Sequence, residues 1–240
     1  MEHVVITKQL IKRFGELRAV DGLDLEVQKG ETYGFIGPNG SGKTTTIKVL
    51  CGLLQATSGE AYVLGRKVPD PSIYPRIGYM PQEIALYLDI KVRQTIQFFG
   101  ELYGLGKKNI ERREEELLSF VDLMAKRDET VANLSEGMKH RLSLAASLVH
   151  EPELLFLDEP TVGVDPELRA HFWEYFTDLT RKGMTVVITT HYMDEANRCD
   201  RVGMIREGRL VAVGEPKQLK EETGTDSLED AFLLYLRKGE

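Results

Sequence analysis

The sequence predicts an α/β fold whose core is a parallel sheet interrupted by a helical insertion. Three short runs of apolar and β-branched residues, at 32–36, 154–157 and 185–189, are typical of buried parallel strands. Between the first two runs, the pattern changes over about 83–134, where apolar residues recur at helical spacing. A glycine-rich loop directly follows the first run, at residues 37–44, where a strand of such a sheet would turn into a helix.

The bulk composition is that of one soluble globular domain. The chain has 240 residues, of which 42% are apolar and 29% charged, so residues 1–240 are treated as a single domain. The formal net charge of −7 argues against binding to a nucleic-acid backbone, and we expect no nucleic-acid partner. The two cysteines, Cys51 and Cys199, lie far apart in the sequence and are expected to stay reduced.

The sequence contains no visible targeting or membrane-spanning segment. The first ten residues lack the basic and apolar regions of a signal peptide, and no run of about 18 apolar residues occurs. We therefore expect a protein that stays in the cytosol, free or docked to another protein. Its single glycine-rich loop predicts one nucleotide site per chain.

The elements around the first strand follow from their periodicity. Residues 20–27 alternate between apolar and polar, as a half-buried strand does. After the glycine loop, apolar residues return at helical spacing and predict a helix with one face on the core. The apolar positions are Leu23, Leu25 and Val27 in the strand, and Ile47, Leu50, Cys51 and Leu54 in the helix.

The insertion and the C-terminal part are predicted in the same way. Within 83–134 the polar run "GLGKKNIERREEE" is interpreted as a solvated helix face. Residues 202–214 read as a hairpin with its turn at Glu207 and Gly208, and about 215–240 as a helical tail in which Ser227 caps a helix. The helical stripes are Val92, Ile96, Phe99 and Tyr103; Leu117, Leu118 and Val121; Met138, Leu142, Ala145 and Val149; and Leu228, Ala231, Phe232 and Tyr235.

The glycine loop "GPNGSGKT" has the pattern G-x-x-x-x-G-K-[ST] of a phosphate-binding loop and predicts a P-loop NTPase core. Glycines let the backbone turn its N–H groups toward phosphate where a Cβ would obstruct them. Lys43 brings a positive charge to the β- and γ-phosphates, and the hydroxyl of Thr44 can ligate Mg²⁺. The predicted nucleotide contacts are Gly37, Pro38, Asn39, Gly40, Ser41, Gly42, Lys43, Thr44 and Thr45.

Two acids, Asp158 and Glu159, follow the strand 154–157, where ligands of open α/β sheets bind. Asp158 suits a carboxylate that holds Mg²⁺ directly or through water. Glu159 suits a general base that orients or deprotonates an attacking water. Two acids can also simply close a strand at a solvated turn, but the phosphate loop favours the functional interpretation.

The stretch "LSEGM" at 134–138 is the most specific motif, because it precedes the strand acids by about twenty residues and opens a helix. Together with the loop and the acids it resembles the nucleotide-binding subunit of ABC transporters, over nearly the whole chain. The resemblance implies an N-terminal antiparallel β subdomain beside the P-loop core and an inserted helical subdomain. It also implies that Ser135 and Gly137 bind the ATP held by the phosphate loop of a second subunit.

The same resemblance implies roles for four further residues. Phe14 resembles the aromatic residue that stacks on adenine, although a Phe near a strand can also be an ordinary buried residue. Gln82 resembles the loop glutamine that senses Mg²⁺ and the attacking water. Asp165 resembles the aspartate that crosses between two sites, and His191 the switch histidine at the γ-phosphate.

The sequence departs from the usual family signature Leu-Ser-Gly-Gly-Gln at two positions. Glu136 replaces the first glycine and Met138 replaces the glutamine. A carboxylate facing a phosphate would be repelled, so we expect Glu136 to point away from the nucleotide. Met138, "THYMDEA" and "SLEDAFLLYL" are similar to the drug- and antibiotic-exporter branch.

The predicted function is therefore an ATP-hydrolysing subunit that uses Mg²⁺ and powers a separate membrane permease, in the direction of export. The sequence leaves open whether two identical copies pair or a paralogue supplies the second subunit, and it does not identify the cargo. The resemblance implies that the subunit lies on the inner face of the cell membrane. Tyr87, Leu88 and Phe98 are candidate permease contacts. Three alternatives are a soluble ABC-type regulator or translation factor, a chromosome-maintenance or repair ATPase, and a P-loop kinase. The second normally contains long coiled coils, which this sequence lacks.

Overall fold

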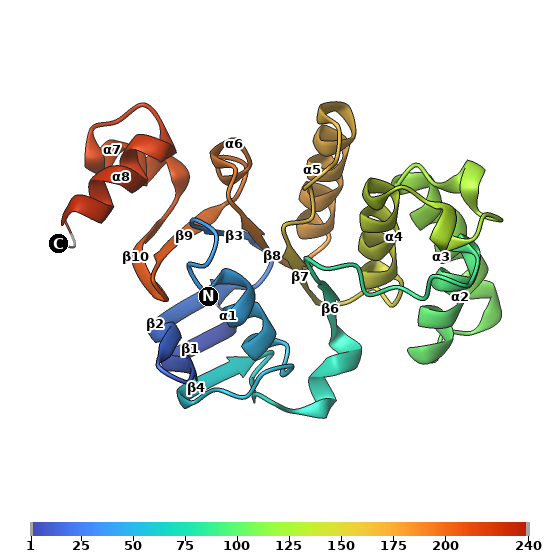
Figure 1. Cartoon of the computed structure of the whole chain (residues 1–240), viewed down its shortest axis with the longest axis horizontal. Coiled ribbons are helices and arrows are strands. Elements are labelled where there is room, and N and C mark those ends of the chain that lie inside the picture. The colour runs from blue at the N-terminus through green and yellow to red at the C-terminus, as the bar shows by residue number, and fades with distance from the viewer. Residues whose placement is uncertain (1, 239–240) are drawn as a thin grey trace.

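The computed structural model describes residues 2–238, whose strands form two sheets (Figure 1). The four-stranded sheet has the order β2-β1-β4-β5, and its strands pair antiparallel. The N-terminal antiparallel β subdomain is thus confirmed. Its strands are β1 (His3–Phe14), β2 (Leu17–Gln28), β4 (Ser58–Val63) and β5 (Arg66–Lys67).

The six-stranded sheet has the order β10-β9-β3-β8-β7-β6 and is parallel except for the β9–β10 hairpin. The parallel core and the hairpin turn predicted at Glu207 and Gly208 are confirmed. The sequence patterns did not reveal β6, which pairs with β7 at one edge. The strands are β3 (Thr32–Ile36), β6 (Ile77–Met80), β7 (Leu154–Asp158), β8 (Thr185–Thr190), β9 (Arg201–Arg206) and β10 (Arg209–Gly214).

Both faces of the six-stranded sheet are buried, because successive side chains of a strand point to opposite faces. In β7, Leu154 and Phe156 join the core shared with the four-stranded sheet and α1. Leu155 and Leu157 join the second core, which lies under the helices. Continuous burial on two sides explains why the strand has no alternation of polar residues in its sequence.

The helices fall into groups around this sheet. Figure 1 shows α2, α3 and α4 together beside the edge that carries β6 and β7, and α7 with α8 near β10. They are α1 (Lys43–Leu50), α2 (Val92–Leu102), α3 (Lys107–Phe120), α4 (Glu136–Leu148), α5 (Pro166–Arg181), α6 (Met193–Ala196), α7 (Pro216–Thr223) and α8 (Leu228–Lys238). Short 3₁₀ turns occupy Pro71–Arg76, Met124–Lys126 and Val131–Asn133.

The helical stripes of the insertion, of 138–149 and of 228–235 pack on the core as the periodicity predicts. The helix predicted after the glycine loop is shorter than expected, because α1 ends at Leu50 and Leu54 lies beyond it. Ser227 caps α8 through a hydrogen bond from the N–H of Asp230. Residues 239–240 of the expected helical tail lie outside the described residues. Both cysteines are buried and free, as expected. Across 2–238, no helix has the length and apolar character needed to cross a bilayer.

The prediction of a fully solvated charged run in the insertion is wrong at two positions. Arg113 and Glu114 on α3 are each only 4% exposed. The guanidinium of Arg113 donates to the carbonyls of Leu148 and Val149, which α4 leaves without a partner in the helix where it ends. The carboxylate of Glu114 accepts hydrogen bonds from Gln97 and Arg127. These two side chains therefore join α3 to its neighbours.

Phe172 on α5 tests the helix-covered core. Its side chain is fully buried, whereas Phe14 is 48% exposed. We expect Phe172→Ala to lower the free energy of unfolding by about 3–5 kcal/mol, because it opens a cavity. Phe14→Ala, the same change at an exposed position, should cost about 0.5 kcal/mol or less. Urea unfolding measures both, and equal losses would contradict the described packing.

Candidate functional site

The phosphate loop leaves β3 at Ile36 and enters α1 at Lys43, as the motif predicts. The glycines are required by their surroundings. A Cβ on Gly37 would lie 2.3 Å from the carbonyl oxygen of Ile205, and one on Gly42 would lie 2.3 Å from that of Ala19. Neighbouring strands therefore press against the loop from outside, which leaves its inner face for phosphate.

Lys43 is held inside the loop and is only 5% exposed. Its Nζ donates to the carbonyl oxygens of Gly37 at 2.8 Å and Pro38 at 3.1 Å, and lies 3.8 Å from the carboxylate of Glu159. Burial lowers the pKa of Lys43, while the two neighbouring carboxylates oppose this effect. A buried lysine with this environment differs from the surface lysine of an ordinary glycine turn.

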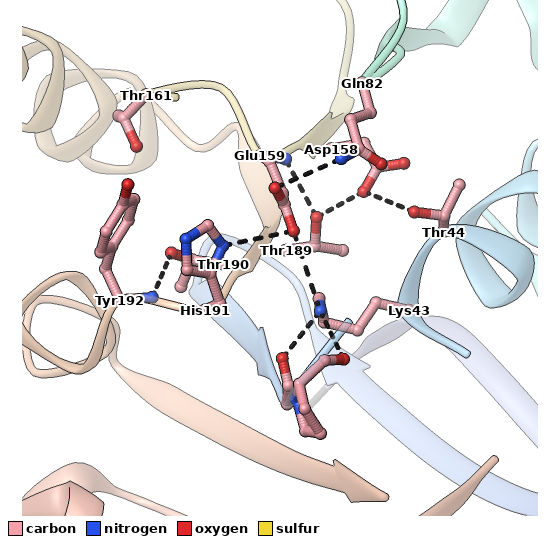
Figure 2. A network of polar contacts seen from close by, with 12 residues as sticks. Lys43, Thr44, Gln82, Asp158, Glu159, Thr161, Thr189, Thr190, His191 and Tyr192 are labelled. Atoms are coloured by element: carbon pink, nitrogen blue, oxygen red, sulfur yellow. Dashed lines mark hydrogen bonds and ion pairs between the residues drawn. The ribbon is translucent and has the colours of Figure 1, made fainter. Parts of the chain in front are cut away.

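Asp158 ends β7 and is completely buried. Its Oδ1 accepts hydrogen bonds from the hydroxyls of Thr189 at 2.5 Å and Thr44 at 3.1 Å (Figure 2). Its Oδ2 finds no hydrogen-bond partner among residues 2–238. Burial raises the pKa of the Asp158 carboxyl, although both hydroxyls act in the opposite direction.

These donors fit Mg²⁺, a small cation that takes one or two carboxylates together with phosphate oxygens and water. An unpartnered carboxylate oxygen, a threonine hydroxyl and the amide of Gln82 are all oxygen ligands suited to it. Within 2–238, no cluster of three or more His, Cys, Asp or Glu side chains could hold a metal by itself.

Glu159 is the centre of a group of polar side chains contributed by four segments. Its Oε1 lies 3.4 Å from Nδ1 of His191 and 3.8 Å from Nζ of Lys43, and its Oε2 accepts from Nε2 of Gln82 at 3.4 Å. Figure 2 shows these three side chains around the carboxylate. The backbone of Glu159 is left-handed, with φ of 54°, and Thr189 accepts its N–H. Such backbone strain persists where surrounding structure imposes it, often at functional sites.

A cavity of about 590 Å³ opens beside this group, within the size range of small-molecule sites. Phe14 lies at the end of β1 and lines it half-exposed, so it is not an ordinary buried residue. Gln82 and Glu159 line it from the other elements. The loop residues that line it are Asn39, Gly40, Ser41, Gly42, Lys43, Thr44 and Thr45.

Four residues that line this cavity are not among the predicted site residues, namely Leu17, Arg18, Ala19 and Glu207. The first three open β2, which begins three residues after Phe14, and this proximity in the chain was an available signal. Glu207 belongs to the predicted hairpin turn, whose Gly208 donates its N–H to the carbonyl of Ser41 in the loop. Nothing in the sequence pattern indicated that this turn packs on the phosphate loop.

Ser135, Gly137 and Asp165 do not line the cavity. Ser135 caps α4 and accepts from the N–H of Met138, and Asp165 caps α5 and accepts from the N–H of Leu168. A Cβ on Gly137 would lie 3.1 Å from the carbonyl oxygen of Gly163, so the start of α4 and the turn before α5 touch. Together with Gly163 these three residues form a second group, which we call the cap patch (Ser135, Gly137, Gly163 and Asp165).

Glu136 in this region does not disturb the helix start. Its carboxylate forms an ion pair with Lys139 at 2.9 Å, and its side chain is exposed. The pKa of Glu136 is lowered by the hydrogen bond and charge of Lys139. Because a nearby cation offsets the negative charge, this residue is less repulsive to phosphate than an isolated glutamate would be.

The fold and the loop–carboxylate geometry define a P-loop NTPase. The sequence profile of the ABC transporter family matches residues 20–162. A solved "Structure of ATP binding subunit of ABC transporter" is similar over 97% of this chain and 99% of its own, at 26% identity and a TM-score of 0.90. The chain therefore belongs to the ABC transporter family, as an ATP-binding protein of that family.

Two curated relatives illustrate the similarity. The "Probable multidrug ABC transporter ATP-binding protein YbhF" of Escherichia coli is 42% identical over 98% of this chain, which spans 42% of that relative's length. The "Linearmycin resistance ATP-binding protein LnrL" of Bacillus subtilis is 38% identical, over 94% of this chain and 76% of its own.

The buried charge of Asp158 generates a stability prediction. Burial raises its pKa in the folded chain above the unfolded value, so ionisation destabilises the fold as the pH rises through the folded pKa. Asp158→Asn keeps an oxygen for the two threonine hydroxyls and removes the charge. At pH 8, without nucleotide or Mg²⁺, it should stabilise the fold by about 1 kcal/mol.

That gain should shrink below about pH 4, where aspartate is protonated in both states. Thermal melting across pH measures it, and Asp178→Asn on the exposed face of α5 is the matched control. A lower melting temperature for Asp158→Asn at pH 8 would contradict the assignment of an uncompensated buried charge.

Proposed function

We propose that the chain hydrolyses ATP by in-line attack of water on the γ-phosphate and thereby drives a separate membrane permease. The observation that carries this proposal is the group around Glu159, in which Lys43, Gln82 and His191 meet one carboxylate beside the phosphate loop. Catalysis of phosphoryl transfer depends mainly on positioning and electrostatic stabilisation. The group around Glu159 can supply both positioning and electrostatic stabilisation beside the phosphate loop.

Each side chain then has a role that follows from its contacts. Lys43 would move from the loop carbonyls to the β- and γ-phosphates, which are stronger acceptors for its charge. Glu159 would orient or deprotonate the attacking water, and His191 would hold the edge of the γ-phosphate. Mg²⁺, held by Thr44, Asp158 and Gln82 together with phosphate oxygens, would neutralise negative charge on the transferred group.

The adenine end of the nucleotide would lie against Phe14, whose ring is exposed and faces the cavity. Aromatic rings stack on nucleobases through their faces, and the contact needs no particular hydrogen bond. Backbone N–H groups of the loop would bind the phosphates at the start of α1, where the helix dipole also favours negative charge. These contacts would span the cavity from Phe14 to Lys43.

The cap patch supplies the second half of the proposal. Ser135 and Gly137 begin a helix of 13 residues, whose first N–H groups favour an anion. Because they lie outside the cavity of their own chain, we infer that they close on the ATP held by a second subunit, with Asp165 crossing between the two sites. ATP would join the subunits, and hydrolysis would release them, which is a two-state motion.

Export is the direction that the relatives support, since their names refer to multidrug transport and linearmycin resistance. The same names favour the transporter subunit over a soluble regulator. The permease would dock beside Gln82 and the insertion of 83–134, where Tyr87, Leu88 and Phe98 expose apolar surface. The chain would then lie on the inner face of the cell membrane, with residues 215–240 as a helical tail of one ATP-binding domain.

Glu159→Gln tests the proposed base. The change keeps the volume and removes the negative charge that attracts the water's proton, so turnover should fall at least about 10²-fold while ATP binding persists. The unhydrolysed ATP should trap a dimer that is visible by size-exclusion chromatography with Mg²⁺. Glu174→Gln, on an exposed position of α5, is the control. Hydrolysis at the parent rate would remove Glu159 from this role.

Ser135→Arg tests the cap patch. The long side chain should block closure of two subunits, and the ATP-dependent dimer should disappear along with turnover. Binding of ATP by the single chain should change less than about twofold, because the cavity does not include Ser135. Ser119→Arg adds the same group to an exposed position of α3. Loss of ATP binding by the monomer would show that Ser135 serves its own chain's nucleotide.

A further inference from the structure

Glu195 is a buried carboxylate that the proposed hydrolysis does not use. It lies on α6, four residues after His191, and is 1% exposed. Its Oε1 accepts the hydroxyl of Thr161 at 2.5 Å, and its Oε2 accepts the hydroxyl of Thr190 at 2.6 Å. Each oxygen thus accepts one short hydrogen bond from a threonine hydroxyl, and hydrogen bonds to a carboxylate are the stronger kind.

The two threonines belong to the two segments that carry the reacting side chains. Thr161 comes two residues after Glu159, in the turn that leads to Asp165. Thr190 ends β8 next to His191, and its hydroxyl also accepts the N–H of Tyr192 at 3.0 Å. Figure 2 shows Thr161 and Thr190 on these two segments. The carboxylate of Glu195 bridges them.

Arg169 provides a positive charge for this bridge. Its Nε lies 3.9 Å from Oε1 of Glu195 and finds no hydrogen-bond partner within residues 2–238. Its guanidinium stacks over the ring of Tyr192, with the central carbon 5.1 Å from the ring centroid, and its Nη1 lies 3.8 Å from Asp194. Because Arg169 stands on α5, the helix that Asp165 caps, the same contacts attach α5 to the His191 segment.

We propose that Glu195 is a positioning residue that fixes the Glu159 turn relative to His191, so that both reach the γ-phosphate in one geometry. This inference rests on the proposed function, in which these two side chains act on the same ATP. A carboxylate with two acceptor oxygens is suited to the task, since it can hold two hydroxyls at a set separation. Loss of either hydrogen bond would leave nucleotide binding intact and loosen the arrangement for hydrolysis.

Thr161 allows a matched test, because Val has its shape without the hydroxyl and Ser keeps the hydroxyl. We expect Thr161→Val to lower kcat about 10- to 100-fold with KM and ATP affinity within about twofold, as small displacements of reacting groups do. Thr161→Ser should recover most of kcat. Thr95→Val is the control, since Thr95 is equally buried and its hydroxyl donates to the carbonyl of Lys91 at the start of its own helix. Its kcat should equal that of the parent.

A double-mutant cycle with His191→Ala separates positioning from general loss of structure. If Thr161 acts through His191, Thr161→Val should reduce kcat far less in the His191→Ala background than in the parent. Independent, multiplicative losses would overturn the proposal, and so would a Thr161→Val variant with the parent kcat. Melting temperatures accompany each variant. If Thr161→Val does not fold, Glu195→Gln, which preserves volume and one acceptor oxygen, takes its place in the cycle.

The parent chain with its permease is the reference for testing both the proposed hydrolysis and the positioning role of Glu195. A parent that binds ATP and does not hydrolyse it would overturn the proposed function. An active parent with an unaffected Thr161→Val variant would overturn only the positioning role of Glu195.

Discussion

The parallel register of the central sheet is the constraint on which the site depends. Ile36 of β3 pairs with Thr190 of β8, and Asp158 of β7 pairs with Thr189 of the same strand. The carboxyl ends of the three strands therefore meet at one edge. The phosphate loop follows β3, the two acids lie at the end of β7, and His191 follows β8. No long loop is needed to gather them, and the buried strands place Glu159 3.8 Å from Lys43 and 3.4 Å from His191.

Electrostatics explain why this edge needs a ligand. Asp158 and Glu159 are both buried, with Lys43 as the near cation, and burial shifts the pKa values of Asp158 and Lys43 toward their neutral forms. In the proposed function, a triphosphate with Mg²⁺ would bring both a new partner for the lysine and a cation for the carboxylates. We therefore expect this edge to favour the ligand-bound state over the empty one, as functional sites often do.

The sequence predicted those parts that depend on local pattern. The central strands, the phosphate loop and the acids follow from periodicity and spacing, and the helix that Ser135 caps from its stripe. Arg113 was misjudged because a charged run looks the same whether its side chains reach water or the free carbonyls at the end of another helix. The sequence did not indicate the roles of Glu207 and Glu195 for a similar reason. The segments that they contact are brought next to them by the tertiary fold and not by a local pattern.

The chain presents two separate groups, a cavity with the Glu159 centre and the cap patch, and neither alone encloses a nucleotide. The central claim is that two subunits must join to complete one hydrolytic site. A crystal structure with Mg²⁺ and a non-hydrolysable ATP analogue tests it most directly. We predict a triphosphate enclosed between the phosphate loop of one copy and Ser135 and Gly137 of another. A triphosphate fully enclosed within a single copy would contradict the account.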